Sequence, residues 1–186
     1  MSRFTITPTP LAGLLCLQRQ PLADERGFLA RLFCAQELAA AGWPGPVAQI
    51  NHTHTAERST VRGLHYQRPP APEAKLVSCL RGAVWDVAVD LRANSPTFLQ
   101  WHAQELSARN HTALLIPPGF AHGFQALEDG AELLYVHSAP YTPACEGALN
   151  VHDPRLCITW PLPVHGLSPR DAAHPLLGAD FEGIVL

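Results

Sequence analysis

The feature that most constrains this fold is the regular interruption of short apolar runs by proline and glycine. The 186 residues include 18 prolines and 13 glycines, spread along the whole sequence and not gathered into one linker. Both residue types favour turns and end regular secondary structure. Examples are the turns expected at residues 94–96 (NSP) and 128–130 (EDG). This pattern is typical of an all-β domain with many turns.

Counting the apolar and alternating runs predicts about ten short strands, with little helix. Two hairpins are expected, the first joining 75–80 to 83–91 and the second joining 121–127 to 131–137. The other expected strands are 14–18, 28–33, 47–54, 61–67, 98–106, 112–116 and 156–160. Short peripheral helices are predicted over 35–41 and after Ser168, an N-cap followed by proline. The sequence therefore predicts a single β-barrel or jelly-roll domain over residues 1–186.

Charge and composition exclude several classes of function. A formal net charge of -3 and a pI near 6.3 argue against a broadly basic nucleic-acid surface. No apolar run reaches the roughly 20 residues that a membrane helix needs. The first residues lack the layout of a signal peptide, so a cytoplasmic protein is expected. The five scattered cysteines form no CxxC pair, which argues against a disulfide framework or a cysteine zinc site.

The strongest chemical signal is residues 62–67 (RGLHYQ), followed by Lys75 on the next expected strand. Histidine is the side chain best suited to move a proton at neutral pH, although an isolated strand histidine is often only packed or solvated. Strict strand alternation places Arg62 and His65 on opposite faces. If both reach one cavity, a bulge or twist is expected at Gly63.

A metal site is one alternative. His52 and His54 share a strand face, Glu57 follows them, and His122 lies after a proline-glycine turn. This layout resembles that of metal-binding cupins, in which histidines and a glutamate hold a transition metal. The match is incomplete, because the gap to Glu57 is short and Ala126 stands where the motif ends in asparagine.

A second resemblance covers nearly the whole chain. Its motifs occur in order at 24–28 (DERGF), Gln49 and Asn51, 62–67 (RGLHYQ), 75–77 (KLV), 84–92 (VWDVAVDLR), 95–98 (SPTF), 116–124 (IPPGFAHGF) and 167–171 (LSPRD). Together they resemble dTDP-4-dehydrorhamnose 3,5-epimerase and related nucleotide-sugar epimerases. The resemblance implies a cupin-type jelly roll that works as a homodimer without a metal or other cofactor. It also implies a nucleotide-linked 4-keto-6-deoxyhexose as substrate, in deoxysugar biosynthesis.

The resemblance assigns four catalytic residues. His65 matches the base that removes a proton from the carbon beside the ketone, and Asp171 matches the carboxylate that orients this imidazole. Lys75 matches the cation beside the enolate oxygen, and Tyr135 matches the acid that returns a proton to the other face of the ring. Without the resemblance, a tyrosine in an apolar strand is ordinarily barrel lining, and an aspartate at a helix start is ordinarily a surface carboxylate.

The resemblance also assigns seven substrate contacts. Arg26 and Arg62 match diphosphate ligands, which suits the guanidinium fork. The remaining matches are His122 in the sugar site, Tyr141 as the stacking aromatic, and the polar contacts Gln49, Asn51 and Glu146.

Two departures from the family pattern concern specificity. Arg31 stands where a glutamate is usual, and residues 136–140 (VHSAP) replace a more usual Lys-x-Thr-x-Tyr run. Inversion of C3, C5 or both therefore stays open, as do the nucleotide and the sugar. A sugar-binding cupin without catalysis is the remaining alternative.

Overall fold

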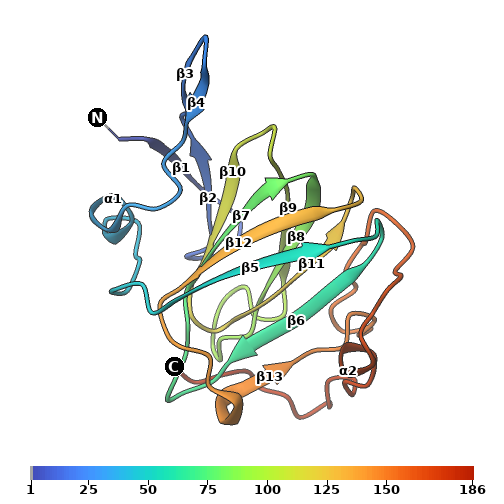
Figure 1. Cartoon of the computed structure of the whole chain (residues 1–186). Helices are drawn as coiled ribbons and strands as arrows, with labels where there is room; N and C mark the ends of the chain where they lie inside the picture. The colour runs from blue at the N-terminus through green and yellow to red at the C-terminus, as the bar shows by residue number, and fades with distance from the viewer. Residues whose placement is uncertain (1) are drawn as a thin grey trace.

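A computed structural model describes residues 2–186 and shows two antiparallel sheets packed face to face (Figure 1). The six-stranded sheet has the order β1 (Phe4–Pro8), β2 (Leu15–Arg19), β10 (Thr112–Ile116), β7 (Lys75–Arg81), β12 (Ala131–His137), β5 (Gln49–Thr55). The five-stranded sheet has the order β13 (Glu146–Ala148), β6 (Val61–Gln67), β11 (Phe120–Ala126), β8 (Ala83–Asp90), β9 (Trp101–Ser107). The predicted all-β, cupin-type jelly roll is confirmed.

The remaining elements are small. Strands β3 (Leu22–Asp24) and β4 (Gly27–Leu29) form a separate hairpin, which projects from the barrel at the top of Figure 1. The helices are α1 (Ala35–Ala39), the 3₁₀ turn η1 (Pro143–Cys145) and α2 (Pro169–Ala172). Within residues 2–186, no helix combines the length and the apolar character needed to cross a membrane.

Both predicted hairpins are wrong. Strand β7 pairs with β10 and β12, whereas β8 pairs with β11 and β9, so the reversal at Gly82 joins opposite sheets. The turn between β11 and β12 also crosses from one sheet to the other. In both cases the two strands face each other across the core, as Val77 and Val84 do. A tight turn between two apolar runs has the same sequence signature in either arrangement.

Several strand boundaries also differ from the prediction. Within the predicted strand 98–106, the observed strand β9 starts only at Trp101. Within the predicted strand 28–33, the observed strand β4 ends at Leu29. Residues 156–160 form no strand, because they cover the outer face of the five-stranded sheet instead of pairing with it. Strands β1, β3 and β13 were not expected from the sequence. All three are short strands at an edge, which carry little hydrophobic periodicity.

The apolar side chains form three layers. The central layer lies between the two sheets and includes Phe124, Leu114 and Leu133. The outer face of the five-stranded sheet is covered by the C-terminal segment, where Val87 and Val89 pack near Trp160. The outer face of the six-stranded sheet is covered in part by α1. Because both faces of β8 are buried, its sequence reads as nearly continuous apolar residues, broken only by Asp86 and Asp90.

The expected irregularity at Gly63 is confirmed. His65 pairs with His122 and Arg62 pairs with Phe124, so three steps along β6 match two steps along β11. This bulge brings Arg62 and His65 to the same face. The backbones approach closely here, because a Cβ atom on Gly63 would lie 2.5 Å from the Cα of Gly123. Gly63 also has a φ of 128°, which side-chain-bearing residues rarely adopt.

Candidate active site

A cavity of about 610 Å³ opens between the two sheets at the end of the barrel near α2. Strands β5, β7 and β12 supply one wall, and β6, β11 and β13 supply the other. The cavity is lined by all the predicted site residues except Arg26, namely His65, Tyr135, Lys75, Asp171, Gln49, Asn51, Arg62, His122, Tyr141 and Glu146. Residues that lie up to 122 positions apart, as Gln49 and Asp171 do, thus share one pocket.

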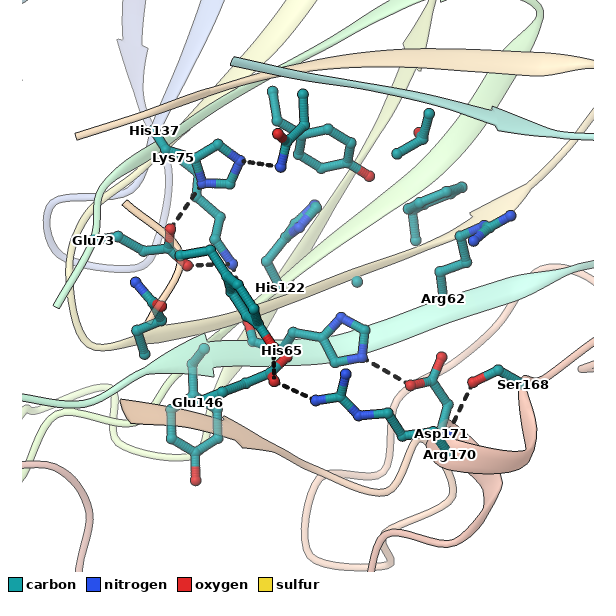
Figure 2. A pocket seen from close by; sticks show the side chains of 18 of the residues that line it. Arg62, His65, Glu73, Lys75, His122, His137, Glu146, Ser168, Arg170 and Asp171 are labelled. Carbon is teal, nitrogen blue, oxygen red and sulfur yellow. Dashed lines mark hydrogen bonds and ion pairs between the residues drawn. The ribbon is translucent and has the colours of Figure 1, made fainter. Parts of the chain in front are cut away.

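His65 and Asp171 form the pair that the sequence predicts. His65 Nε2 lies 2.8 Å from Asp171 Oδ1, and the His65 side chain is 36% exposed while that of Asp171 is 7% exposed (Figure 2). Ser168 caps α2 by accepting a hydrogen bond from the Asp171 backbone N–H, which fixes the start of the helix that carries the carboxylate. Burial lowers the pKa of His65 and outweighs the opposite effect of Asp171. The imidazole is therefore neutral at neutral pH, the state a general base requires.

Lys75 is buried beside this pair. Its ammonium donates to the backbone carbonyl of His65 at 3.2 Å and forms an ion pair with Glu73 at 3.1 Å. Glu73 is itself buried, yet the hydrogen bond from His137 and the charge of Lys75 outweigh burial and hold its pKa below the ordinary value. Lys75 thus has a fixed position, with its charge inside the cavity.

Tyr135 lies on β12, on the wall opposite the strand that carries His65. Burial raises the pKa of Tyr135, and the nearby charge of Asp86 raises it further. The phenol therefore stays protonated at neutral pH and has a proton to give. Its ring lies edge-on to that of His122, with centroids 5.7 Å apart.

His122 belongs to a second histidine–carboxylate pair. Its Nε2 lies 2.9 Å from Asp86 Oδ2, and both side chains are buried in the wall of the cavity. Burial raises the pKa of Asp86, although the contact with His122 opposes this rise. His122 thus reaches the cavity from a deeper position than His65, its partner across the β6–β11 ladder.

Three charged or aromatic side chains meet near the outer part of the cavity. The Tyr141 hydroxyl donates to Glu146 Oε2 at 2.7 Å, and Arg170 forms an ion pair with the same carboxylate. These two hydrogen bonds outweigh burial and hold the pKa of Glu146 below its ordinary value. Tyr141 itself is half exposed, so part of its ring is accessible to a ligand.

The predicted substrate contacts on β5 share one face. Gln49, Asn51 and Thr53 all line the cavity, whereas Ile50 is exposed on the other side of the sheet. The line of polar residues on β5 thus lies inside the pocket. Arg62 also lines the cavity, where its guanidinium donates to the Thr55 hydroxyl at 3.2 Å.

Arg26 lies away from this cavity, on the β3–β4 hairpin. Its side chain is 84% exposed, and its partner is Asp24 in the same hairpin, at 2.5 Å. Phe28 and Leu29 beside it are exposed apolar residues. Arg31, one of the departures from the family pattern, pairs with Glu37 of α1 and is likewise absent from the lining of the cavity.

The residues of the metal-cupin alternative are not brought together. His52 and His54 lie on the exposed face of β5, opposite the face that lines the cavity, and His52 contacts Glu132 at 3.0 Å. His122 is buried on the far wall with Asp86. Within residues 2–186, the one set of three side chains close enough to share an ion is His65, Asp171 and His174. That set differs from the cupin layout.

Among the other residues that line the pocket, three with a carboxylate, imidazole or guanidinium group were not predicted from the sequence: Glu73, His137 and Arg170. His137 follows Tyr135 by two positions on one strand, so the two-residue period identifies it as a neighbour on the same face. Glu73 lies in the irregular segment before β7, close to Lys75, and Arg170 lies in the short helix α2 directly before Asp171. Their sequence positions carry no periodic signal that distinguishes them from surface charges.

The fold and the pocket define the class of protein. A cupin-type jelly roll holds a neutral imidazole, a buried ammonium and a protonated phenol around one cavity, which is the equipment of an acid–base enzyme.

Comparisons with known proteins identify the family. The sequence profile of dTDP-4-dehydrorhamnose 3,5-epimerase matches residues 8–179. The enzyme of that name from Salmonella typhimurium is 41% identical over 92% of this chain and 94% of its own length. A dTDP-4-dehydrorhamnose 3-epimerase from Streptomyces niveus is 38% identical over 89% of this chain and 80% of its own. This chain belongs to the dTDP-4-dehydrorhamnose 3,5-epimerase family.

Solved structures agree with the family assignment. A dTDP-6-deoxy-D-glucose-3,5-epimerase from Legionella pneumophila, in complex with dTDP-4-keto-L-rhamnose, superposes with a TM-score of 0.91 and is 37% identical. The match covers 98% of this chain and 99% of that one.

Proposed function

We propose that this enzyme epimerises a nucleotide-linked 4-keto-6-deoxyhexose at C3, C5 or both, in deoxysugar biosynthesis. The observation that carries the proposal is the position of His65 and Tyr135 on strands of opposite sheets, facing one cavity. Inversion of a carbon centre needs a base on one face of the sugar ring and an acid on the other. The two walls of this cavity offer that arrangement.

The reaction begins with His65. The ketone at C4 acidifies the C–H bond on the neighbouring carbon, and the neutral imidazole takes that proton. The electron pair of the broken bond forms an enolate, whose oxygen gains negative charge. Lys75 stabilises this oxygen, and Asp171 orients the imidazole and stabilises the imidazolium that forms. In this scheme the low pKa of His65 keeps it ready to accept the proton.

Tyr135 completes the inversion. Its phenol delivers a proton to the same carbon from the opposite face, and the C4 ketone re-forms as the enolate collapses. The raised pKa of Tyr135 supports this role, because the residue holds its proton until the carbanion takes it. His122 forms part of the same wall and contacts the sugar.

The nucleotide is assigned to the outer part of the cavity. Arg62 binds the diphosphate, Tyr141 stacks on the base, and Gln49, Asn51 and Glu146 supply polar contacts. An arginine fork suits phosphate oxygens, and an exposed aromatic ring suits a nucleobase. The bound dTDP-sugar in the Legionella relative supports this class of substrate.

We further propose a homodimer in the cytoplasm, in which Arg26 contacts the diphosphate bound to the partner copy. Arg26 is remote from the cavity of its own chain, and its hairpin exposes Leu22, Phe28 and Leu29. A second copy packed on this hairpin covers the apolar side chains and brings in the arginine. Mixing inactive Arg26→Ala and His65→Asn proteins is expected to restore activity, because one cavity of the mixed dimer is then intact. No recovery after confirmed subunit exchange contradicts this arrangement.

The test of the proposed function uses dTDP-4-keto-6-deoxyglucose in heavy water, with C3 and C5 followed by NMR. Deuterium incorporation and inversion that persist in the presence of a chelator are expected, and the two positions report separately which carbons react. Loss of exchange on chelation supports the metal-cupin alternative. Absence of exchange at both carbons indicates a sugar-binding protein or a different substrate.

A further inference from the structure

His137 lies in a continuous chain of hydrogen bonds along one wall of the cavity. The backbone N–H of Tyr141 donates to Gln49 Oε1 at 3.0 Å, and Gln49 Nε2 lies 3.0 Å from Asn51 Oδ1. Asn51 Nδ2 lies 3.4 Å from His137 Nε2, the longest link, and His137 Nδ1 lies 2.8 Å from Glu73 Oε2. Figure 2 shows the His137–Glu73 contact beside the ion pair of Glu73 with Lys75.

The two ends of this chain fix the direction of every hydrogen bond within it. A backbone N–H can only donate, and an ionised carboxylate can only accept. Gln49 must therefore turn its carbonyl towards Tyr141 and its NH₂ towards Asn51. Asn51 must then turn its NH₂ towards His137, so the amide orientations follow from their partners.

The same logic fixes the proton on His137. Its Nε2 must accept from Asn51, so the ring proton resides on Nδ1 and points to Glu73. The low pKa of Glu73 keeps that carboxylate ionised and able to accept. A second proton on the ring places an N–H against the Asn51 NH₂ and breaks the chain at that link.

We propose that His137 is a positioning residue, neutral with its proton on Nδ1, that orients the Asn51 and Gln49 amides for the nucleotide sugar. The proposal rests on the proposed function for the identity of the ligand. His137 lies within the run where the sequence departs from the usual family pattern.

The surroundings of His137 carry both signs of charge. Glu73 contacts His137 through Oε2, and the Glu73 Oε1 atom forms the ion pair with Lys75. Tyr135, on the same strand, stacks its ring at 22° to the imidazole with centroids 6.1 Å apart. Asn51, from β5, is the uncharged neighbour. Lys75 already supplies a positive charge to the Glu73 carboxylate. Glu73 therefore has a cationic partner even when His137 is neutral.

The first experiment measures the tautomer in the unmodified protein. Uniformly ¹⁵N-labelled histidine side chains are recorded by long-range proton–nitrogen NMR at pH 7.5, and His137→Gln assigns the His137 signals by their disappearance. The expected result is a protonated Nδ1 and an unprotonated Nε2. A proton on Nε2 overturns the proposal, whether Nδ1 is also protonated or not. This result does not depend on any substrate.

The second experiment separates positioning from packing. Glutamine at position 137 can donate to Glu73 and accept from Asn51, whereas leucine can do neither. His137→Leu is expected to weaken thymidine diphosphate binding, measured by calorimetry, about tenfold, as loss of an oriented polar contact predicts. His137→Gln is expected to stay within about threefold of the unmodified protein, because both hydrogen bonds persist.

Enzyme kinetics is expected to separate the same two variants of His137. His137→Leu is expected to raise KM about tenfold with a much smaller change in kcat, because ligand positioning and not proton transfer is impaired. Equal losses in the glutamine and leucine variants, with both still folded by thermal melting, overturn the proposal. If the unmodified protein binds no thymidine diphosphate, a thymidine-linked substrate is ruled out, and the tautomer measurement still decides the state of His137.

Discussion

Two histidine–carboxylate pairs face the same cavity from neighbouring strands, and they differ in accessibility. His65 and Asp171 lie 2.8 Å apart, and the histidine is 36% exposed on its side chain. His122 and Asp86 lie 2.9 Å apart, with side-chain exposures of 5% and 0%. The first carboxylate comes from the C-terminal helix α2, whereas the second lies on β8 beside the strand of its histidine.

This difference teaches that the hydrogen bond alone does not identify a base. Burial lowers the pKa of His65 and raises that of Asp86, so in each pair the buried charge is disfavoured. Of the two histidines compared, His65 is the one that combines exposure to the cavity with a partner carboxylate at a capped helix start. The buried pair fixes the wall against which Tyr135 packs.

The largest effect is expected from removing the exposed imidazole. His65→Asn is expected to lower kcat about 10³-fold and to abolish deuterium exchange at the substrate carbon, because a general base contributes an effect of this size. Thermal melting serves as the control for folding. Exchange that continues at nearly the normal rate rules out His65 as the base.

The next effect is expected at the wall beside the buried pair. Tyr135→Phe is expected to slow inversion about 10²-fold while exchange continues, because proton abstraction by His65 needs no acid on the far face. NMR in heavy water measures both quantities on one sample. If exchange and inversion fall by the same factor, the acid role is unsupported.

The two carboxylates provide a matched comparison. Asp171→Asn is expected to lower kcat about 10²-fold with little change in stability, because the imidazole loses its orienting anion. Asp86→Asn is expected to lower kcat only about fivefold and to destabilise the fold by about 1–3 kcal/mol, because a buried contact is lost. Steady-state kinetics measures kcat of the two variants, and denaturant unfolding measures their stability. Equal kinetic effects contradict the distinction between the pairs.

The smallest effect is a shift in pH dependence. The base must be neutral, and the pKa of His65 is lowered from 6.5, so kcat/KM of the free enzyme is expected to fall only below pH 6.5. In Asp171→Asn the acid limb is expected to move to lower pH, because Asp171 raises the pKa of His65. In Asp86→Asn the limb is expected to stay in place. An acid limb above pH 6.5 in the unmodified enzyme contradicts the assignment.

The sequence predicted the fold class, and all of the predicted site residues except Arg26 line one pocket, whereas the two errors in strand pairing have a common cause. The two-residue period of a strand places Arg62 and His65 on opposite faces, and this conflict predicted the bulge at Gly63. The same period cannot tell whether two runs joined by a turn pair within one sheet or pack across two. Both expected hairpins failed for this reason.

The sequence by itself determined a β-rich jelly roll with a proton-transfer motif, because turn residues and alternation are local properties of the chain. Only the tertiary structure decided which imidazole is accessible to a ligand. Burial and charge around His65, His122 and His137 come from strands and loops that are distant in sequence, and no local pattern encodes those distances. The acidic partners Asp171, Asp86 and Glu73 acquire their separate roles in the same way.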